Sequence, residues 1–268
     1  MHNALFAQNG LPHVYDRFET DQVTDEFKKL IKSPDFGGAS VTIPLKQDIE
    51  PLLDEISDDV ETIGALNTIV PIQRKDKSGN TVTQLMGRNT DWLGMVHVLE
   101  AVGLDRNGKK RSGLVIGGGG TARAAIYALH HLGFSPIYLL GRSPHKMQAL
   151  ANSFSGEFNV KVFGPEDILP PTVGIGTIPA DHPADPTMMR ILEELLRVSS
   201  TEDNRIFLEM AYKPPNTPIK LLAEACGWQT VNGLEVLVAQ GVYQFQYWTG
   251  ITPQYDTARV SPKQIVYP

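Results

Sequence analysis

The sequence predicts an α/β fold made of two lobes, and three observations support this prediction. Apolar runs of strand length alternate with helix-like segments along almost the whole chain. Strands that are joined by helices of ten or more residues form parallel βαβ units. One glycine-rich loop joins a strand to a helix near the middle of the chain. The 268 residues, 41% of them hydrophobic, are enough for one large domain or two ordinary ones.

The first part of the chain mixes short helices with strands of a small sheet. The charged, turn-like stretch "QRKDKSGN" between two β-rich runs is typical of a hairpin tip. A helix follows over residues 89–103, with Trp92, Met95, Val96 and Leu99 on one face at helical spacing. Before it we expect helices over 3–8, 21–31 and 45–56, and strands over 13–19, 39–43, 65–72 and 81–87.

The second part of the chain alternates more regularly, as expected for parallel βαβ units. A boundary between the two lobes is expected in "NGKKRSG", residues 107–113, or in the helix just before it. After it we expect strands over 113–118, 136–141, 173–178, 206–212 and 229–231, and helices over 121–133, 143–154, 188–198, 218–227 and 233–250.

Charge and composition exclude several classes of protein. The formal net charge of −6 argues against a general nucleic-acid binder, which needs a basic surface. The single cysteine, Cys226, cannot form an internal disulfide and no Cys/His cluster has metal-ligand spacing, so we expect no metal and a reducing, cytoplasmic location. No apolar run reaches the eighteen or so residues of a membrane helix, and "MHNALFAQNG" lacks the features of a secretory signal.

The glycine loop lies in "LVIGGGGTARAA", between an apolar strand and a helix that starts near Thr121. Gly117, Gly119 and Ala122 match the G-x-G-x-x-G/A spacing of dinucleotide-binding loops. Glycines let the backbone approach a pyrophosphate, and the helix N-terminus offers N–H donors. A tight turn without a ligand can have the same spacing, but the strand before and the helix after favour a nucleotide site. The expected cofactor-binding residues are Gly117, Gly118, Gly119, Gly120, Thr121 and Ala122.

The end of the second strand of this lobe indicates which dinucleotide binds. In NAD-binding proteins an acidic residue about 20 positions after the fingerprint bonds the ribose 2′-hydroxyl. Here the residue 20 positions after Ala122 is Arg142, whose guanidinium suits a 2′-phosphate. Ser143 would add a hydroxyl and Lys146 a second positive charge, although a solvated basic turn would look the same. We therefore predict NADP rather than NAD, with Arg142 and Ser143 as phosphate-binding residues.

Several motifs in order resemble one known family. They are "GGASVTIPLK", "IGALNTI", "GRNTDWLGM", "GGGGTARAA", "GRS" after the second strand, and "GLEVLVAQGVYQFQYWTG". Over nearly its whole length the chain is similar to shikimate/quinate dehydrogenases. It looks most like the fungal branch, which includes the shikimate dehydrogenase domain of the pentafunctional AROM polypeptide and the C-terminal region of the quinate repressor. The resemblance implies a place in the chorismate pathway or in quinate metabolism.

The resemblance also implies a catalytic pair. The lysine of "TIPLK" and the aspartate of "NTD", Lys46 and Asp91, would bind the reacting oxygen and manage its proton while a hydride passes between substrate and NADP. Local sequence places both residues near expected helix starts, where the macrodipole favours an aspartate and opposes a lysine. By the same resemblance, the other site residues are Thr42, Asn67, Gln240 and Tyr212 for the substrate and Gly233 for the cofactor. Taken without the family, Asn67 fits a turn or strand end, Gln240 an exposed helical position and Tyr212 core packing.

The resemblance divides the chain into a substrate-binding lobe (1–89), a dinucleotide-binding domain (90–234) and a C-terminal helix and tail (235–268) that returns to the substrate lobe. The family carries a further strand, and a loop with two serines that hold the substrate carboxylate, before the helix that "MHNALF" begins. We therefore expect a substrate lobe without its first strand. A shortened gene model, a fragment of a longer multidomain polypeptide and a domain with altered function are all open. Gly141, where the family usually has asparagine, is a second departure.

Three functions fit these observations. The first is an NADP-dependent oxidoreductase that interconverts 3-dehydroshikimate and shikimate, with a small-molecule substrate and no direct contact with nucleic acid or membrane. The second is an inactive regulatory domain of the repressor type that binds a metabolite or a protein. The third is a quinate dehydrogenase, which Arg142 disfavours in its NAD-dependent form.

Overall fold

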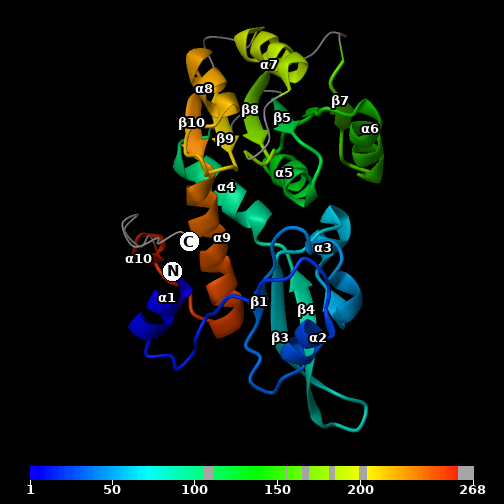
Figure 1. The fold of residues 1–268 in the computed structure, drawn as a ribbon, viewed down its shortest axis with the longest axis vertical. Coiled ribbons are helices and arrows are strands. Elements are labelled where there is room, and N and C mark those ends of the chain that lie inside the picture. Colours follow the sequence, from blue (N-terminus) through cyan, green and yellow to red (C-terminus); the bar gives the residue numbers. More distant parts are fainter. Residues whose placement is uncertain (105–110, 155, 165–168, 181–184, 199–203, 259–268) are drawn as a thin grey trace. The chain divides into compact units, whose positions relative to one another are not determined.

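The computed structural model describes residues 1–104, 111–154, 156–164, 169–180, 185–198 and 204–258 (Figure 1). The chain divides into two compact units. Unit 1 comprises Met1–Gly94 and Val238–Pro268, and unit 2 comprises Met95–Leu237. Most of the predicted linker, residues 107–110, lies outside the described residues. The fold is α/β, as predicted.

Unit 1 is built on a four-stranded sheet in the order β1-β3-β4-β2. The long hairpin of β3 and β4 is antiparallel, as predicted, whereas β2 lies parallel to β4. At the hairpin tip, the Asp76 carboxylate accepts hydrogen bonds from the backbone N–H groups of Ser78 and Asn80, both at 2.8 Å. The strands are β1 (Ala39–Ser40), β2 (Glu55–Ile56), β3 (Thr68–Lys75) and β4 (Thr81–Arg88), and the helical segments are α1 (His2–Gln8), α2 (Asp25–Ile31), η1 (Glu50–Leu52) and α3 (Asp58–Ile63).

Two apolar clusters hold unit 1 together. In one, Phe27 and Ile31 of α2 pack with residues from β3, β4, α3 and the turns after β1. In the other, Leu5 and Phe6 of α1 pack with Phe245, which belongs to the C-terminal half of α9 (Gly233–Thr249), and with α10 (Tyr255–Ala258). The polar residues of the site described below lie between β3, the start of α4 (Asp91–Ala101) and α9.

Two predicted elements of unit 1 are wrong. Residues 13–19 form no strand; the backbone N–H and C=O of Tyr15 bond instead to the side-chain amide of Asn3, at 2.6 and 2.9 Å. Residues 45–56 form no α-helix either, but a series of turns, the 3₁₀ segment η1 and β2. Pro51 cannot donate a backbone hydrogen bond and its ring clashes with the preceding turn of an α-helix. Lys46 therefore lies in a turn, and no α-helix begins at it.

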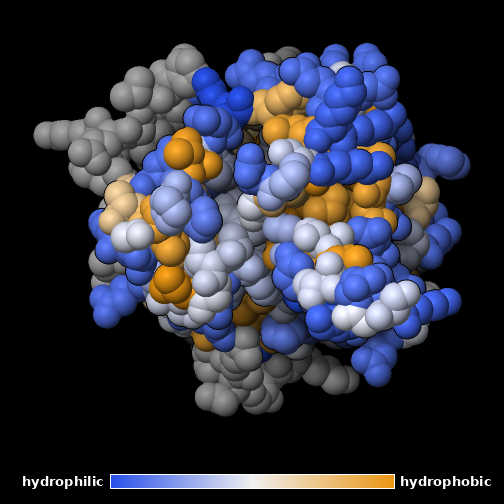
Figure 2. All heavy atoms as spheres, turned by 90° about the horizontal axis from the view of Figure 1, so that it is seen from below, coloured by the Kyte–Doolittle hydropathy of each residue, from blue (hydrophilic) through white to orange (hydrophobic). Residues whose placement is uncertain are grey.

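A cavity of about 440 Å³ separates residues 14–20 from β1 and the turns that follow it. Several exposed apolar side chains line it, among them Val14, Phe18, Leu30 and Ile43. Figure 2 shows apolar residues interspersed with hydrophilic ones on one face of the molecule. Thr42 also lines this cavity.

Unit 2 contains a six-stranded, wholly parallel sheet in the order β10-β9-β8-β5-β6-β7. Counted along the chain this is the 3-2-1-4-5-6 order of a Rossmann fold, in which the direction of winding reverses between β5 and β8. The short strand β7 has no counterpart among the predicted elements, because three residues give no periodic signal. The strands are β5 (Ser112–Ile116), β6 (Ile137–Leu140), β7 (Val160–Val162), β8 (Pro171–Gly176), β9 (Ile206–Glu209) and β10 (Gln229–Asn232).

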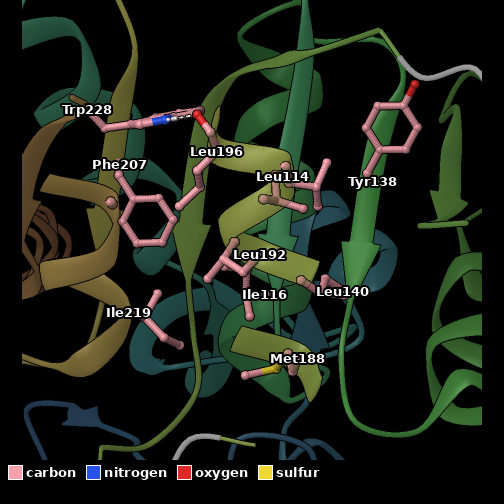
Figure 3. Packing of buried hydrophobic residues seen from close by; sticks show 12 residues of the cluster. Leu114, Ile116, Tyr138, Leu140, Met188, Leu192, Leu196, Phe207, Ile219 and Trp228 are labelled. Atoms are coloured by element: carbon pink, nitrogen blue, oxygen red, sulfur yellow. Dashed lines mark hydrogen bonds between the residues drawn. The ribbon is translucent and has the colours of Figure 1, made fainter. Parts of the chain in front are cut away.

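Helices cover both faces of this sheet. On one face, Leu114 and Ile116 of β5 pack with residues of α7 (Pro186–Val198) and α8 (Pro218–Ala225), and Trp228 donates its indole N–H to the Leu196 carbonyl at 3.1 Å (Figure 3). Because side chains alternate along a strand, Gly113 faces the opposite side. There it lies against Leu129 of α5 (Gly120–His131), and α6 (Pro144–Ser153) packs beside it on β6 and β7.

Helix α4 fits the predicted amphipathic pattern. Met95, Val96 and Leu99 are buried, while the half-buried Trp92 donates its indole N–H to Asp59 at 2.8 Å. In the part of the chain that the structure describes, no helix has the length and apolar character needed to span a bilayer.

Candidate active site

The side chains of Lys46 and Asp91 form an ion pair in unit 1. Lys46 Nζ donates a hydrogen bond to Asp91 Oδ2, and the two side chains are only 12% and 11% exposed. Attraction between opposite charges is several times stronger in such a setting than in open water. The carbonyl of Lys46 accepts a hydrogen bond from the Leu66 N–H at 2.8 Å, and the buried Leu45 and Ile49 anchor the turns on either side. The turn therefore holds the lysine backbone firmly.

Asp91 is held from its backbone and from its second carboxylate oxygen. It is the first residue of α4, and its N–H donates to the Asn89 side chain at 3.0 Å. Asn89 is itself buried and donates its amide to the Ala65 carbonyl at 2.9 Å. Asn67 donates to Asp91 Oδ1 at 2.9 Å. Both carboxylate oxygens therefore have donors.

Asn67 is the centre of this polar cluster, and its orientation is fixed by the backbone. Its Oδ1 accepts hydrogen bonds from the Thr90 N–H and the Thr68 hydroxyl, both at 2.7 Å. A backbone N–H can only donate, so Oδ1 must be the oxygen and Nδ2 must face Asp91. From that position Nδ2 also lies 3.1 Å from Gln240 Oε1 and 3.0 Å from the Thr90 hydroxyl.

The structure thus brings together four of the predicted residues, Lys46, Asp91, Asn67 and Gln240. The fifth predicted residue of unit 1, Thr42, lines the cavity beside β1 instead, and within the described ranges it forms no hydrogen bond to these four.

Sequence reasoning missed the residues that support this cluster. Gln244 is buried in α9; it donates to Thr68 Oγ1 at 3.1 Å and accepts from Ser40 Oγ at 2.8 Å. The Thr90 hydroxyl donates to Gln240 Oε1 at 2.9 Å. One signal was available, because Gln240 and Gln244 are four residues apart in a largely apolar helix and so share a face.

The glycine loop of unit 2 lies where the sheet order reverses. Gly117 follows β5 with a φ of 119°, in the left-handed half of conformational space that favours glycine. Gly118 and Gly119 are exposed, and a Cβ built on Gly119 would meet nothing within 4 Å. Gly119 is also the N-cap of α5, and among the described residues no side chain caps the first turn there. The geometry fits an anion approaching the backbone at this helix N-terminus.

Arg142 and Ser143 follow β6, the strand next to β5. Ser143 is the N-cap of α6, and its Oγ accepts a hydrogen bond from the Lys146 N–H at 3.4 Å. Arg142 and Lys146 are both exposed. The guanidinium of Arg142 is therefore accessible to a phosphate beside the glycine loop.

Tyr212 and Gly233 follow two other neighbouring strands, β9 and β10. Gly233 lies so close to the backbone of Met210 that a Cβ would be 2.2 Å from its carbonyl oxygen, so only glycine fits. The buried Glu209, at the end of β9, accepts hydrogen bonds from the Ala211 N–H and the Thr217 hydroxyl. Burial raises the pKa of the Glu209 carboxyl.

No group of three or more histidine, cysteine or acidic side chains that could hold a metal ion occurs among the described residues. The polar cluster of unit 1 consists of a lysine, a carboxylate, side-chain amides and threonine hydroxyls.

The parallel sheet with its glycine loop at the reversal point defines unit 2 as a Rossmann-type domain. Comparisons with known proteins refine this class. Residues 1–69 match the family description "Shikimate dehydrogenase substrate binding domain". Residues 233–259 match "Shikimate 5'-dehydrogenase C-terminal domain". These matches and the solved structures described next assign the chain to the shikimate dehydrogenase family.

Three solved structures illustrate the likeness. The dehydroquinate dehydratase and shikimate dehydrogenase of AroM from S. pombe is 38% identical with a TM-score of 0.79, over 96% of this chain and 48% of that one. The chain thus spans about half the length of that relative. Shikimate 5-dehydrogenase from Thermus thermophilus, in complex with NADP(H) and shikimate, is 26% identical with a TM-score of 0.74, over 96% and 90% of the two chains. Quinate dehydrogenase from Corynebacterium glutamicum, in complex with NAD, is 26% identical with a TM-score of 0.73, over 96% and 90%.

Proposed function

We propose that the chain is an NADP-dependent shikimate dehydrogenase that interconverts 3-dehydroshikimate and shikimate. The observation that carries this proposal is the ion pair of Lys46 and Asp91, held by Asn67 in a protein whose other unit is a Rossmann-type domain. The pair offers a proton donor and an acceptor at one place, and reduction of a ketone needs a proton at the oxygen as well as a hydride at the carbon.

In this proposal Lys46 and Asp91 handle the proton. The nicotinamide, when bound, supplies the hydride to the carbonyl carbon in reduction and takes it back in oxidation. As the carbonyl oxygen gains negative charge, the Lys46 ammonium stabilises it and donates a proton from Nζ. In oxidation the neutral amine takes this proton back from the hydroxyl. Asp91 orients Lys46 and stabilises its charged form, and Asn67 keeps Asp91 in place.

The geometry of unit 2 supports NADP as the cofactor. The open space at Gly119 and the first turn of α5, which no described side chain caps, suit the pyrophosphate. The exposed Arg142, after the neighbouring strand, suits the 2′-phosphate through paired, charge-assisted hydrogen bonds. Ser143, Thr121 and Gly233 would complete the cofactor contacts. Thr42, Gln240 and Tyr212 would contact the substrate, together with Asn67.

We also propose that the chain works in the cytoplasm and belongs to a longer polypeptide, since the solved AroM relative combines two named activities. The corresponding division would be residues 1–89 for the substrate and 90–234 for the dinucleotide, with 235–268 returning to the first lobe.

The experiment that tests the proposal follows nicotinamide absorbance with NADP⁺ or NAD⁺, each with shikimate and, separately, with quinate. We expect turnover with NADP⁺ and shikimate. Turnover with quinate and NAD⁺ alone would instead support a quinate dehydrogenase. If the metabolite or cofactor binds and no pair gives turnover, the regulatory, repressor-type function replaces the enzyme.

Two variants make the test specific to the residues. Lys46→Ala should abolish turnover and leave NADPH binding nearly unchanged, because Lys46 belongs to unit 1 and the glycine loop to unit 2. Lys28→Ala is the matched control, since Lys28 is a solvent-exposed lysine of the same unit that pairs with Asp25. Equal loss of turnover in both variants, or loss of NADPH binding in Lys46→Ala, would contradict the assignment of Lys46.

A further inference from the structure

Met147 of α6 occupies the space beside two glycines that are far apart in the sequence. A Cβ built on Gly118 would lie 2.5 Å from Met147 Cε. A Cβ built on Gly141 would lie 2.6 Å from Sδ, 3.0 Å from Cε and 3.3 Å from Cγ of the same side chain. Carbon atoms in good contact are about 3.5–4.0 Å apart, so neither position has room for a side chain while Met147 stays in place.

These two glycines lie at the two loops that a dinucleotide would touch. Gly118 belongs to the glycine loop after β5, and Gly141 immediately precedes Arg142 after β6, the neighbouring parallel strand. In a Rossmann fold the first loop holds the pyrophosphate and the end of the second strand holds the ribose of the adenosine half. Met147 is only 5% exposed, so it supports both loops from the protein side.

We propose that Met147 determines cofactor binding in this chain by forming the floor under the adenosine ribose. The inference rests on the proposed NADP-dependent function and adds a residue to it. In this arrangement position 141 gives no side-chain contact to the ribose, and the thioether fills the volume that such a side chain would need. A thioether is flexible and polarisable, which suits an irregular gap between two loops.

The proposed roles of Met147 and Arg142 can be distinguished by how each variant changes the binding of NADPH and of NADH. NADPH and NADH share the adenosine ribose and differ only in the 2′-phosphate. Met147→Ala removes the floor under the shared part, so both should bind about tenfold more weakly or worse, as expected for lost apolar contacts in a binding pocket. Arg142→Ala should weaken NADPH far more than NADH. Adenosine 2′,5′-bisphosphate, which carries only the adenosine half, should show the full effect of Met147→Ala.

The sharpest test exchanges the occupant of this space. Gly141→Asn alone should weaken NADPH binding, because the new side chain meets three atoms of Met147. Gly141→Asn combined with Met147→Ala should bind NADPH better than either single variant, since the asparagine then fills the space that the methionine left. Binding is measured by titration calorimetry with NADPH, NADH and adenosine 2′,5′-bisphosphate, so no turnover is needed.

Met188→Ala is the matched control, because Met188 of α7 is 4% exposed, belongs to the same unit and packs in the apolar cluster with Ile116 instead of beside the two glycines. The inference is overturned if Met147→Ala and Met188→Ala lose the same affinity for NADPH, or if the effects of Gly141→Asn and Met147→Ala on that affinity are additive. In either case, NADPH binding by the unaltered chain keeps the cofactor assignment. Absence of NADPH binding by the unaltered chain overturns both. If Met147→Ala does not fold, Met147→Leu takes its place in the same exchange.

Discussion

The ion pair between Lys46 and Asp91 should make a measurable contribution to the stability of unit 1. Asp91→Asn leaves the Lys46 ammonium without its counter-charge in a place where the side chain is 12% exposed. Removing one partner of a buried pair costs about 3–5 kcal/mol, whereas exposed pairs contribute about 0.2–1 kcal/mol. Because the two side chains keep a small exposure, we expect a cost near the lower end of the range of about 3–5 kcal/mol given for buried pairs. We therefore expect Asp91→Asn to lower the free energy of unfolding by about 3 kcal/mol.

The partner variant should cost less. In Lys46→Met the Asp91 carboxylate keeps its hydrogen bond from Asn67, so part of its charge remains compensated. The double variant contains neither charge and should be more stable than the sum of the single losses predicts, by about 1–2 kcal/mol.

Urea unfolding can report on unit 1 by itself. Of the three tryptophans, Trp92 and Trp248 belong to unit 1 and Trp228 to unit 2. Tryptophan fluorescence in a Trp228→Phe background therefore follows unit 1. The reasoning about the pair would fail if each single variant lowers the free energy of unfolding by less than about 0.5 kcal/mol. It would also fail if the losses of the two single variants add up to that of the double variant within the same margin, because the two charges would then not be energetically coupled.

Three further predictions concern buried groups and a close contact. Because its pKa is raised, Glu209 keeps a proton in the folded state at pH values above 4.5, where the unfolded state loses it. The free energy of unfolding of unit 2 should therefore fall as the pH rises above 4.5. Glu209→Gln should remove this pH dependence, measured by urea unfolding followed at Trp228. For His2 the pH dependence runs the other way, because burial lowers the pKa of its imidazole below the ordinary value of 6.5. The stability of unit 1 should therefore be complete above pH 6.5 and fall as the pH drops below it, and His2→Phe should flatten that fall. Gly38→Ala should destabilise unit 1 by about 2 kcal/mol or more, because its φ is 134° and the new Cβ would lie 2.3 Å from Trp248 Nε1, whereas Gly37→Ala, with nothing within 4 Å, should cost far less.

The Rossmann-type unit could be predicted from sequence because its signals are local. Each strand and helix there is a continuous periodic segment, and the glycine loop fixes one junction between them. The hairpin of β3 and β4 was predictable for the same reason, since a charged turn separates two β-rich runs. The sheet order is a property of the family of folds and follows once the unit is recognised.

The two errors in unit 1 have different causes, one a contact between distant residues and the other a local signal. Residues 13–19 have the composition of a strand, but Asn3 takes the hydrogen bonds of Tyr15, and nothing in the local pattern indicates this. The helical pattern of residues 45–56 has apolar residues at suitable spacing, yet Pro51 interrupts the backbone bonds. That error was avoidable, because a proline inside a helical pattern is itself a signal of a break.

The position of Lys46 shows what sequence alone could and could not explain. Its place beside Asp91 came from a family resemblance, and the local argument from a helix dipole was wrong because the residue lies in a turn. The turn has a physical consequence that a helix would not have. It lets the Lys46 carbonyl bond to Leu66, the residue before Asn67, so the lysine and the amide that holds Asp91 are tied to one stretch of backbone.

Asn67 makes the proposed site rigid before any substrate binds. Its oxygen is saturated by Thr90 and Thr68, and one of its two N–H groups is directed to Asp91. The other N–H has Gln240 Oε1 and the Thr90 hydroxyl as acceptors. A substrate hydroxyl can therefore gain a hydrogen bond from Asn67 only by replacing one of these two acceptors, not by competing with Asp91. In the proposed function, a substrate hydroxyl that bonds to Asn67 in this way would leave the hydrogen bond between Asn67 and Asp91 in place.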